Sequence, residues 1–405
     1  MRPLAISIAC VFLLAGSALS ADSAAVKTIS PAGSRVSFAR AITFPTDVGY
    51  PISIAAGDLN RDGFPDLAVV SSDGGGAYPF VSYALGNGDG TFRQWQIGPA
   101  TTAPGCVLLA DVTGNRKLDA LTTDAISSDM DIAFGNGKGG FSSNEDIKNV
   151  GPIYLAVADV NHDGIPDVVG SGGGPDSVFV MLGQGNKKFS QPMTFPSGGN
   201  SPSGVAVGDL NHDGIPDMVV ANSGDLFGKL ENLSVLLGRG KGKLGQPQTY
   251  NAGPNPVAVV LGDFNGDGNL DAAVSNNIGV DVLLGKGDGT FAAAANYPTG
   301  GVPTWIVAAD FNGDGILDLA VSTLSNSSDY VAVLLGKGDG TFQRPRKFGV
   351  GLIPWQLVVA DFNHDGWPDI ATVNNGDSTV SVLLNTTKFP TPRGSGSAEG
   401  NRKKR

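Results

Sequence analysis

The chain has 405 residues, of which 59 are glycine and 7% aromatic, and it carries a formal net charge of −11. This length suits two or three ordinary domains or one repeat architecture. The acidic balance argues against nucleic acid and anionic membrane surfaces as partners, because both require a basic surface. Short Val, Leu and Ala runs separated by Gly, Asn, Asp and Pro predict short strands and tight turns.

The first residues have the pattern of a cleaved secretory signal. Arg2 precedes an apolar run that begins at Leu4, and small residues follow before position 21. The run is shorter than the roughly 20 residues that cross a bilayer, which weakens the alternative of a retained membrane anchor. We therefore expect a signal peptide at 1–20, a linker at 21–35, and a secreted protein (extracellular, periplasmic or at the cell surface) with no transmembrane span after the signal is removed.

A nine-residue acidic pattern then recurs seven times along the chain. Its copies are DLNRDGFPD from Asp58, DVTGNRKLD from Asp111, DVNHDGIPD from Asp159, DLNHDGIPD from Asp209, DFNGDGNLD from Asp263, DFNGDGILD from Asp310 and DFNHDGWPD from Asp361. Successive copies start 47 to 54 residues apart. A period near 50 is too long for most helical solenoids and fits a four-stranded blade.

The segments around each copy predict the strands of that blade. An apolar segment such as YLAVA precedes the loop, and a second such as MVVAN follows it. A third segment such as VAVLLG runs into a Gly-rich hairpin such as GKGDGTF at Gly336, which begins a fourth strand. Each repeat is therefore predicted to be a four-stranded antiparallel meander.

The two ends of the repeat array predict how the ring closes. The seventh unit ends at VSVLLNTTKF without its hairpin and fourth strand, whereas VSFARAITFP at 36–45 resembles the fourth strands of other units. We infer an all-β, seven-bladed β-propeller of four-stranded antiparallel blades over 36–388, in which the N-terminal strand completes the last blade. An open, curved array is the alternative, but only a closed ring leaves no exposed end units. The basic segment 389–405 is predicted to be a disordered tail.

The repeated loop has the chemistry of a calcium site. Positions 1, 3, 5 and 9 carry side-chain oxygen in every copy, and position 6 is Gly in six copies. Ca²⁺ takes six to eight oxygens at about 2.4 Å, which alternate acidic side chains and a carbonyl at position 7 supply, while Gly permits the turn. A single copy could be a chance Asx-rich turn. Six close matches at one period favour about six bound Ca²⁺ ions.

The candidate ligands are positions 1, 3, 5, 7 (by its carbonyl) and 9 of the six regular loops. They are Asp58, Asn60, Asp62, Phe64 and Asp66; Asp159, Asn161, Asp163, Ile165 and Asp167; Asp209, Asn211, Asp213, Ile215 and Asp217; Asp263, Asn265, Asp267, Asn269 and Asp271; Asp310, Asn312, Asp314, Ile316 and Asp318; and Asp361, Asn363, Asp365, Trp367 and Asp369. The loop from Asp111 to Asp119 is degenerate, with Thr113 at position 3 and Arg116 in place of Gly, so we expect it to be empty. The seven loops hold 20 of the 38 acidic residues, and six Ca²⁺ ions would nearly cancel the formal charge.

On these residues the chain resembles the FG-GAP or VCBS-type repeat proteins, whose integrin α-subunit relatives form seven-bladed propellers with DxDxDGxxD calcium loops. The resemblance covers roughly Val36 to Thr387, because loop, VLLG strand and GDGTF hairpin recur in that order. It implies that the cation loops join the first and second strands of each blade on one face. It also implies a scaffold for adhesion or recognition, without naming a ligand.

No catalytic constellation is evident in the sequence. The three histidines, His162, His212 and His364, all occupy position 4 of a loop, where we expect them to point outward, so no Ser-His-Asp triad or His-based zinc site can be built. The acids outside the loops show no spacing that marks a catalytic pair. They include Asp129, Asp131, Glu145, Asp146, Asp225, Glu231 and Asp329.

Aromatic residues precede the innermost strand of several repeats, on the face opposite the loops. They are Tyr50, Tyr154, Trp305 and Trp355. Such residues suit stacking on sugars or anchoring a protein partner, but we weight at least as heavily the interpretation that they cap the blades or plug the central channel. We favour a secreted, monomeric, non-enzymatic calcium-binding module for adhesion or for recognition of extracellular carbohydrate or protein. The alternative is a calcium-dependent carbohydrate-active enzyme, for example a polysaccharide lyase.

Overall fold

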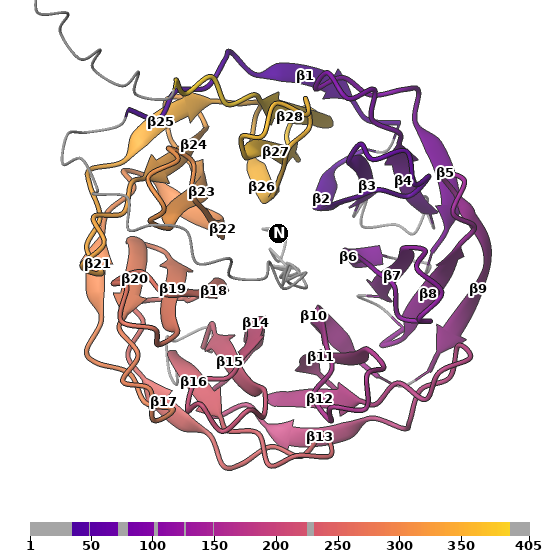
Figure 1. Ribbon diagram of the computed structural model, residues 1–405, viewed down its shortest axis with the longest axis vertical. Coiled ribbons are helices and arrows are strands. Elements are labelled where there is room, and N and C mark those ends of the chain that lie inside the picture. The colour runs from indigo at the N-terminus through magenta and orange to yellow at the C-terminus, as the bar shows by residue number, and fades with distance from the viewer. Residues whose placement is uncertain are drawn as a thin grey trace, which may run out of the picture.

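Seven four-stranded antiparallel sheets form a ring of blades in the computed structural model (Figure 1). The structure describes residues 35–47, 49–71, 80–100, 104–124, 127–148, 150–224 and 231–388. The expected signal peptide, all but the last residue of the expected linker, and the expected tail lie outside these ranges. Every helix or strand within them is a strand, which confirms the all-β propeller class. Accordingly, no apolar helix of membrane-spanning length occurs in the described part of the chain.

The blades follow one another in chain order. The strands of blades 1 to 4 are β2 (Pro51–Gly57), β3 (Asp66–Ser71), β4 (Phe80–Ala84), β5 (Gln96–Pro99); β6 (Pro104–Ala110), β7 (Asp119–Asp124), β8 (Met130–Gly135), β9 (Phe141–Ile147); β10 (Pro152–Ala158), β11 (Asp167–Gly172), β12 (Ser177–Met181), β13 (Met193–Pro196); and β14 (Pro202–Gly208), β15 (Asp217–Asn222), β16 (Asn232–Leu236), β17 (Gln248–Tyr250). Those of blades 5 to 7 are β18 (Ala258–Gly262), β19 (Asp271–Asn276), β20 (Gly279–Leu283), β21 (Ala295–Tyr297); β22 (Val302–Ala309), β23 (Asp318–Leu324), β24 (Tyr330–Leu334), β25 (Arg346–Gly349); and β26 (Pro354–Ala360), β27 (Asp369–Asn374), β28 (Thr379–Leu383) with β1 (Ile42–Pro45).

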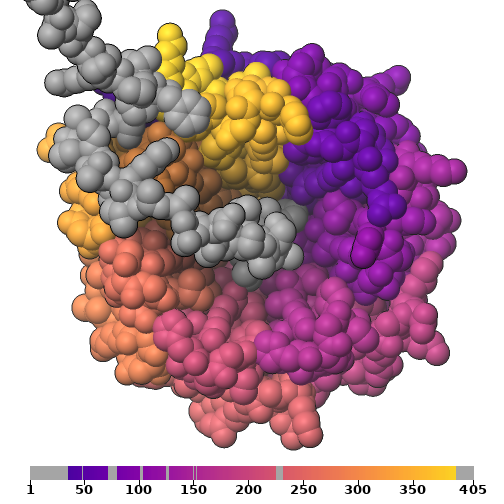
Figure 2. Space-filling model, viewed as in Figure 1, coloured from indigo at the N-terminus to yellow at the C-terminus, as the bar shows by residue number. Residues whose placement is uncertain are grey.

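Burial changes from the inside of each blade outward. The second strands, such as β3 and β15, are buried along their whole length, whereas outer strands such as β13 alternate between half-buried and exposed residues. Both faces of a middle strand are covered because each blade packs between two others (Figure 2). This explains why strands such as β15 and β24 carry nearly continuous apolar runs instead of alternating ones.

The N-terminal segment closes the ring as predicted. β1 pairs antiparallel with β28 and forms the outermost strand of blade 7. Beyond this pairing, Phe38 bridges Asn385, and the backbone N–H of Ser37 donates to the Thr387 hydroxyl at 3.0 Å. The inner strand β2 of the first blade contacts the inner strand β26 of the last, so the open array is wrong (Figure 1).

Polar side chains join the inner strands of neighbouring blades. The Ser53 hydroxyl accepts the backbone N–H of Val107 at 3.0 Å. Gln356, which is fully buried, accepts the backbone N–H of Ile54 through Oε1 at 2.8 Å. A buried N–H without a partner is costly, so these bonds fix how neighbouring blades meet at the centre.

Candidate functional site

The six regular loops fold in one way around their first three oxygen-bearing side chains. In the first loop the Asp62 N–H donates to both Asp58 Oδ1 (3.1 Å) and Asn60 Oδ1 (2.9 Å). Two oxygens that accept the same N–H must lie close together, and Asn60 Nδ2 in turn donates to Asp62 Oδ2 at 2.7 Å. The shared N–H recurs in the loops that start at Asp159, Asp209, Asp263, Asp310 and Asp361. The side chains at positions 1, 3 and 5 therefore converge.

The glycine at position 6 has the conformation that the turn requires. Gly63 adopts a φ of 92°, in the left-handed region, and its N–H donates to Asp58 Oδ2 at 2.9 Å. Glycine adopts this φ without steric cost. In the degenerate loop Arg116 takes the same place with a φ of 63°, and its N–H donates to Asp111 Oδ2 at 2.5 Å. The turn therefore survives in the second loop, although a side chain there strains it.

The ninth carboxylate has a structural role that the sequence analysis missed. Asp66 is fully buried, and its Oδ2 and Oδ1 accept the N–H groups of Leu59 and Gly86, each at 2.8 Å. Gly86 begins the hairpin of the same blade, and the equivalent bond to Oδ1 recurs in the other six blades. Burial raises the pKa of Asp66 to about 6 and that of Asp318 to about 8. Each ninth carboxylate thus fastens its loop to the end of the third strand.

Five of the six regular loops, all but the one from Asp159, also accept a hydrogen bond at position 2 from the following blade. The N–H of Gly340, in the hairpin of blade 6, donates to the carbonyl of Phe264 in the loop of blade 5 at 3.1 Å, and the rings of Phe342 and Phe264 meet edge to face at 5.6 Å. The segment that follows β28 substitutes for the missing hairpin of blade 7. There, Asn385 Nδ2 donates to the Phe311 carbonyl at 2.9 Å. These five loops are therefore fastened both to their own blade and to the next.

The donor set of a regular loop fits Ca²⁺. Positions 1, 3 and 5 supply converging oxygens, and position 7 supplies a carbonyl of the kind that Ca²⁺ accepts. The ninth carboxylate uses one lone pair on each oxygen for an amide, and an ionised carboxylate has about four such sites. Among the described residues no three His, Cys, Asp or Glu side chains lie close enough to hold a metal ion, so the three Asp of a regular loop, at positions 1, 5 and 9, do not all gather at one point. Each loop thus offers carboxylates, an amide and a carbonyl.

The degenerate loop satisfies its carboxylates from within the chain. The Thr113 hydroxyl lies 3.3 Å from Asp111 Oδ1 and 3.2 Å from Asp119 Oδ2. One hydroxyl has a single proton to donate, so it bridges the two acids in the place where the regular loops carry the Asn amide. The prediction that this loop is empty remains a prediction.

The histidines at position 4 were expected to point outward, but each contacts the next loop around the ring. His162 Nε2 hydrogen-bonds the Gly214 carbonyl, and His212 Nε2 lies 2.8 Å from Asn269 Oδ1. The ring of His364 meets Phe64 edge to face at 5.5 Å. All three side chains are exposed on one side and in contact on the other. They therefore link loops of neighbouring blades.

The four aromatic candidates divide into buried and accessible residues. Tyr154 on β10 is fully buried and Trp305 on β22 is 2% exposed, and their rings stack at 6.4 Å with 21° between the planes. Both strands are the innermost of their blades (Figure 1), so for this pair the structure favours packing at the centre over ligand contact. Trp355 is half-buried and packs against the two hydrophobic clusters that blade 1 shares with its neighbouring blades. Tyr50 is 57% exposed and keeps the predicted accessible position.

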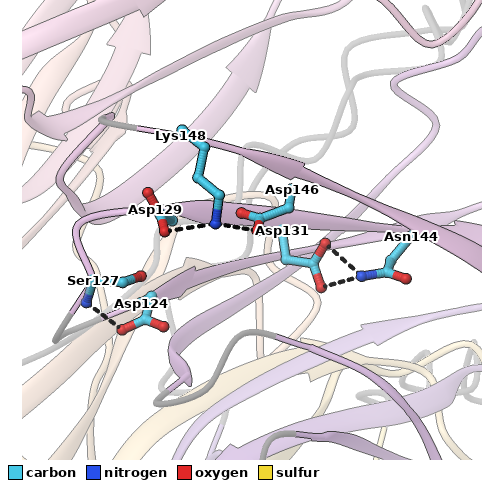
Figure 3. Close-up of polar contacts among 7 residues, drawn as sticks. All are labelled: Asp124, Ser127, Asp129, Asp131, Asn144, Asp146 and Lys148. Carbon is cyan, nitrogen blue, oxygen red and sulfur yellow. Dashed lines mark hydrogen bonds and ion pairs between the residues drawn. The ribbon is translucent and has the colours of Figure 1, made fainter.

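A pocket of about 200 Å³ gathers acids that their sequence spacing did not connect (Figure 3). Asp129, Asp131 and Asp146 line it together with Asn144 and Lys148. These residues lie at the ends of β7, β8 and β9 away from the Asp111 loop, hence on the edge where recognition was predicted. The pairing of β8 with β9 places Asp131 opposite Asp146, and a prediction of this register from the sequence would have brought the two acids together.

The polar groups of this pocket are satisfied mostly by one another. Lys148 Nζ pairs with Asp129 at 3.0 Å and with Asp146. Asn144 Nδ2 donates to both oxygens of Asp131 at 3.1 Å. Burial, with a smaller contribution from the charge of Asp146, raises the pKa of Asp131 to about 6. Figure 3 shows the Asp129–Lys148–Asp146 group beside the separate Asn144–Asp131 pair.

Comparison with known families agrees with the repeat structure. The FG-GAP-like repeat model matches residues 58–122, 159–220, 211–274, 263–321 and 321–372, which is more than half of the chain. The chain belongs to the FG-GAP-like repeat family. Each matched segment of this FG-GAP-like protein ends in the second strand of a blade, so the family repeat has the same period as the blades. A search of curated proteins finds no match.

Several solved structures share the fold at low sequence identity. An Agrocybe aegerita lectin, described by its specific recognition of non-reducing terminal N-acetylglucosamine, is 18% identical with a TM-score of 0.53 over 83% of this chain and 86% of that one. BBS1N, solved in complex with ARL6DN, is 14% identical with a TM-score of 0.56 over 88% and 98%. A functionally unknown protein from Desulfotomaculum acetoxidans is 14% identical with a TM-score of 0.50 over 75% and 90%. At these identities the likeness shows the fold alone.

Proposed function

We propose that this FG-GAP-like propeller is a secreted, calcium-binding, non-enzymatic module for adhesion or for recognition of extracellular carbohydrate or protein. The main support for calcium binding is that the oxygens at positions 1, 3 and 5 converge, and that this arrangement is repeated in six loops. Bound Ca²⁺ would supply positive charge where carboxylates otherwise repel one another.

The chain's own contacts explain how ordered loops stabilise the whole ring. Each ninth carboxylate fastens a loop to its own hairpin, as Asp318 does to Gly336 at 2.8 Å. The hairpin of the following blade then fastens the same loop from the other side, as Gly340 does at Phe264. A loop that stays ordered therefore orders two blades, which couples metal binding to folding.

In this proposal the ligand binds at the edge of the ring opposite the acidic loops. Tyr50 lies there at the start of β2 with 57% of its surface exposed, and the pocket lined by Asp131 and Lys148 opens at the same edge. Sites of this kind are most precise when a rigid scaffold holds them. The fold of the N-acetylglucosamine-recognising lectin supports carbohydrate as one ligand class. Fold likeness alone does not choose between carbohydrate and protein.

The proposal is tested by binding in calcium and in chelator. The full chain is presented to immobilised glycans and extracellular matrix proteins, and we expect calcium-dependent retention on at least one of them. Retention by none of them, or retention unaffected by chelator, would contradict the proposal.

A depolymerisation screen separates this function from the enzymatic alternative. The same chain is incubated with acidic and neutral polysaccharides in calcium, and new chain ends are measured. We expect none, because the carboxylates of the pocket in Figure 3 are held by Lys148 and Asn144. Steady release of unsaturated ends would show a polysaccharide lyase instead.

A further inference from the structure

We propose that the acidic pocket of blade 2 binds a sugar unit that carries a free amino group, and that Asp131 accepts hydrogen bonds from its ammonium (Figure 3). The inference rests on the proposed recognition function and names a ligand class for it. Ala100, which follows the last strand of blade 1, lines the pocket together with residues of blade 2. The volume of about 200 Å³ is below the roughly 300–1,000 Å³ of drug-sized sites and suits a small polar ligand such as one sugar ring.

The pocket holds more negative charge than its one ammonium can balance. Its lining includes four carboxylates and one cation, which are Asp124, Asp129, Asp131, Asp146 and Lys148. Lys148 Nζ pairs with Asp129 and Asp146, whereas the side-chain donor of Asp131 is the neutral amide of Asn144. Asp131 is also only 2% exposed, and a buried carboxylate gains most from a cation that reaches it. The charge that lacks a cationic partner is therefore that of Asp131.

A buried hydroxyl beside Asp131 has no hydrogen-bond partner in the described part of the chain. Thr122 lies directly opposite Asp131 in the pairing of β7 with β8, so both side chains project from the face of blade 2 that carries the pocket. Thr122 is 1% exposed, and its Oγ1 is unsatisfied. A buried hydroxyl in this state is uncommon, because it has lost water without gaining a protein partner. An ammonium bound at Asp131 has three N–H donors, and one of them can serve this hydroxyl.

The blade itself does not require a carboxylate at this place in its third strand. The equivalent residues of five other blades are Ser82, Phe179, Ser234, Ala332 and Ser381. Four of these are small and all are uncharged, so an acid is not needed for the strand to pair. Asp131 is therefore a feature of blade 2 and not of the scaffold.

Blade 5 shows what a buried acid at this position looks like without a pocket. Its acid is Asp281, which lies opposite Val274 and Asn296 and accepts a hydrogen bond from Asn296 Nδ2 at 2.5 Å. In blade 2 the residue opposite Asp131 on the outer strand is a second acid, Asp146. Like charges directly opposite one another destabilise a sheet, and a bound cation would relieve this repulsion.

The rest of the lining favours a sugar over the side chain of a lysine. Ala100 is the one apolar residue among the described residues that line the pocket, so the four-carbon stem of a lysine would meet mostly polar groups. A sugar ring instead brings hydroxyls. Ser127, Asn144 and Asp146 line the pocket with exposed side chains that can bond them. Acetylation of the amine would remove the positive charge, so the carboxylates select the free amine.

The test compares two ligands that differ in the charge of their nitrogen. A glucosamine dimer and its acetylated counterpart, N,N′-diacetylchitobiose, are titrated into the full chain by calorimetry near neutral pH. The same titrations are made with Asp131→Asn and with the matched control Asp281→Asn, which makes the same exchange at the equivalent position of blade 5. Both variants keep the size of the side chain, and thermal unfolding confirms that they fold.

We expect the native chain and Asp281→Asn to bind the glucosamine dimer roughly tenfold more tightly than the acetylated dimer, because acetylation removes a charge-assisted bond. Asp131→Asn should bind the glucosamine dimer roughly tenfold more weakly than the native chain does. Equal affinity of the native chain for the two dimers, no binding of the glucosamine dimer, no loss in Asp131→Asn, or an equal loss in Asp281→Asn would overturn the proposal.

Two further measurements separate a sugar amine from other ligands. Lys148→Met should strengthen binding of the glucosamine dimer, because it leaves Asp129 and Asp146 to the ligand. Weaker binding would show that Lys148 itself recognises the ligand, which contradicts the proposal. A short peptide with one lysine should bind less tightly than the dimer, and tighter binding of the peptide would assign the pocket to a protein partner instead.

The outcome is separable from that of the proposed function. If the glucosamine dimer does not bind while the native chain is retained in calcium on another glycan or on a matrix protein, the pocket proposal fails and the recognition function stands. If the dimer binds as expected but chelator leaves all retention unchanged, the pocket proposal stands and the calcium part of the proposed function fails.

Discussion

The loops of blades 2 and 6 have the same turn but different chemistry. In blade 6, Asp310 and Asn312 accept one N–H, at 3.2 and 2.9 Å, and so converge with Asp314. In blade 2, the Thr113 hydroxyl takes the equivalent place between two carboxylates. Both loops nevertheless fasten their hairpin through the ninth carboxylate, at 2.8 and 2.9 Å. The comparison teaches that the fastening role of the ninth carboxylate is separable from the convergence of the side chains at positions 1, 3 and 5.

Blades 2 and 6 also differ in the residues that pair between their second and third strands. Asp131 faces Thr122 across β7 and β8, whereas the same pairing in blade 6 joins Val321 to Ala332. The polar pair of blade 2 belongs to the face that carries the pocket of Figure 3. Blade 2 thus combines an irregular loop with a buried carboxylate, Asp131, whose pKa burial raises to about 6.

The largest effect is expected from the ninth carboxylates, where the blades should behave alike. Asp318→Ala and Asp119→Ala each leave the N–H of a hairpin glycine unpaired. We expect each to lower the free energy of unfolding by roughly 2–4 kcal/mol, because an unsatisfied buried group is costly. Urea unfolding in chelator measures this without the calcium that Asp318 is also expected to bind. A large loss in blade 6 alone would show that Asp119 is not a structural equivalent of Asp318.

A smaller effect is expected at position 5, where the blades should differ. Asp314→Ala should remove about one calcium ion per chain and about 2–3 kcal/mol of stability in excess calcium, with little change in chelator. The matched control, Asn115→Ala in blade 2, should leave the calcium count unchanged. Calorimetric titration measures both counts. Unchanged stoichiometry in Asp314→Ala would remove that loop from the metal sites.

The buried acid of blade 2 predicts a pH dependence. The pKa of Asp131 is raised by burial from 3.8 to about 6, so the folded chain binds this proton more tightly than the unfolded chain. The stability that the protonated acid contributes is complete below about pH 4 and is lost as the pH rises through 6. Asp131→Asn should therefore gain stability relative to the native chain over this window, by up to about 3 kcal/mol. A difference between the two chains that is flat from pH 4 to 7 would contradict the assignment.

The smallest effect is expected from repairing the degenerate loop. The double variant T113N/R116G restores the residues that the regular loops carry at positions 3 and 6. It should raise the calcium count by about one and stabilise the chain by about 1 kcal/mol, part of it from relief of the strained turn at Arg116. Titration beside the native chain measures the count, and an unchanged count would mean that positions 3 and 6 do not decide metal binding.

The architecture could be predicted from sequence because its signals are local and repeated. The 50-residue period fixes the blade, and the resemblance of residues 36–45 to a fourth strand identifies β1. The fastening role of Asp66 was not visible, because Gly86 lies 20 residues away and joins it only when the third strand pairs. Contacts between blades were equally hidden, as with His212 and Asn269, which lie 57 residues apart. Burial of Tyr154 and Trp305 likewise depends on two distant blades meeting at the centre.

The central claim is that six of the seven loops hold calcium and so stabilise the ring. Its most direct test is calorimetric titration of calcium into the chelator-treated full chain, with thermal unfolding measured before and after. We predict about six ions per chain and a large rise in the unfolding midpoint. No binding heat and an unchanged midpoint would show that the acidic loops are only turns, and would contradict the claim.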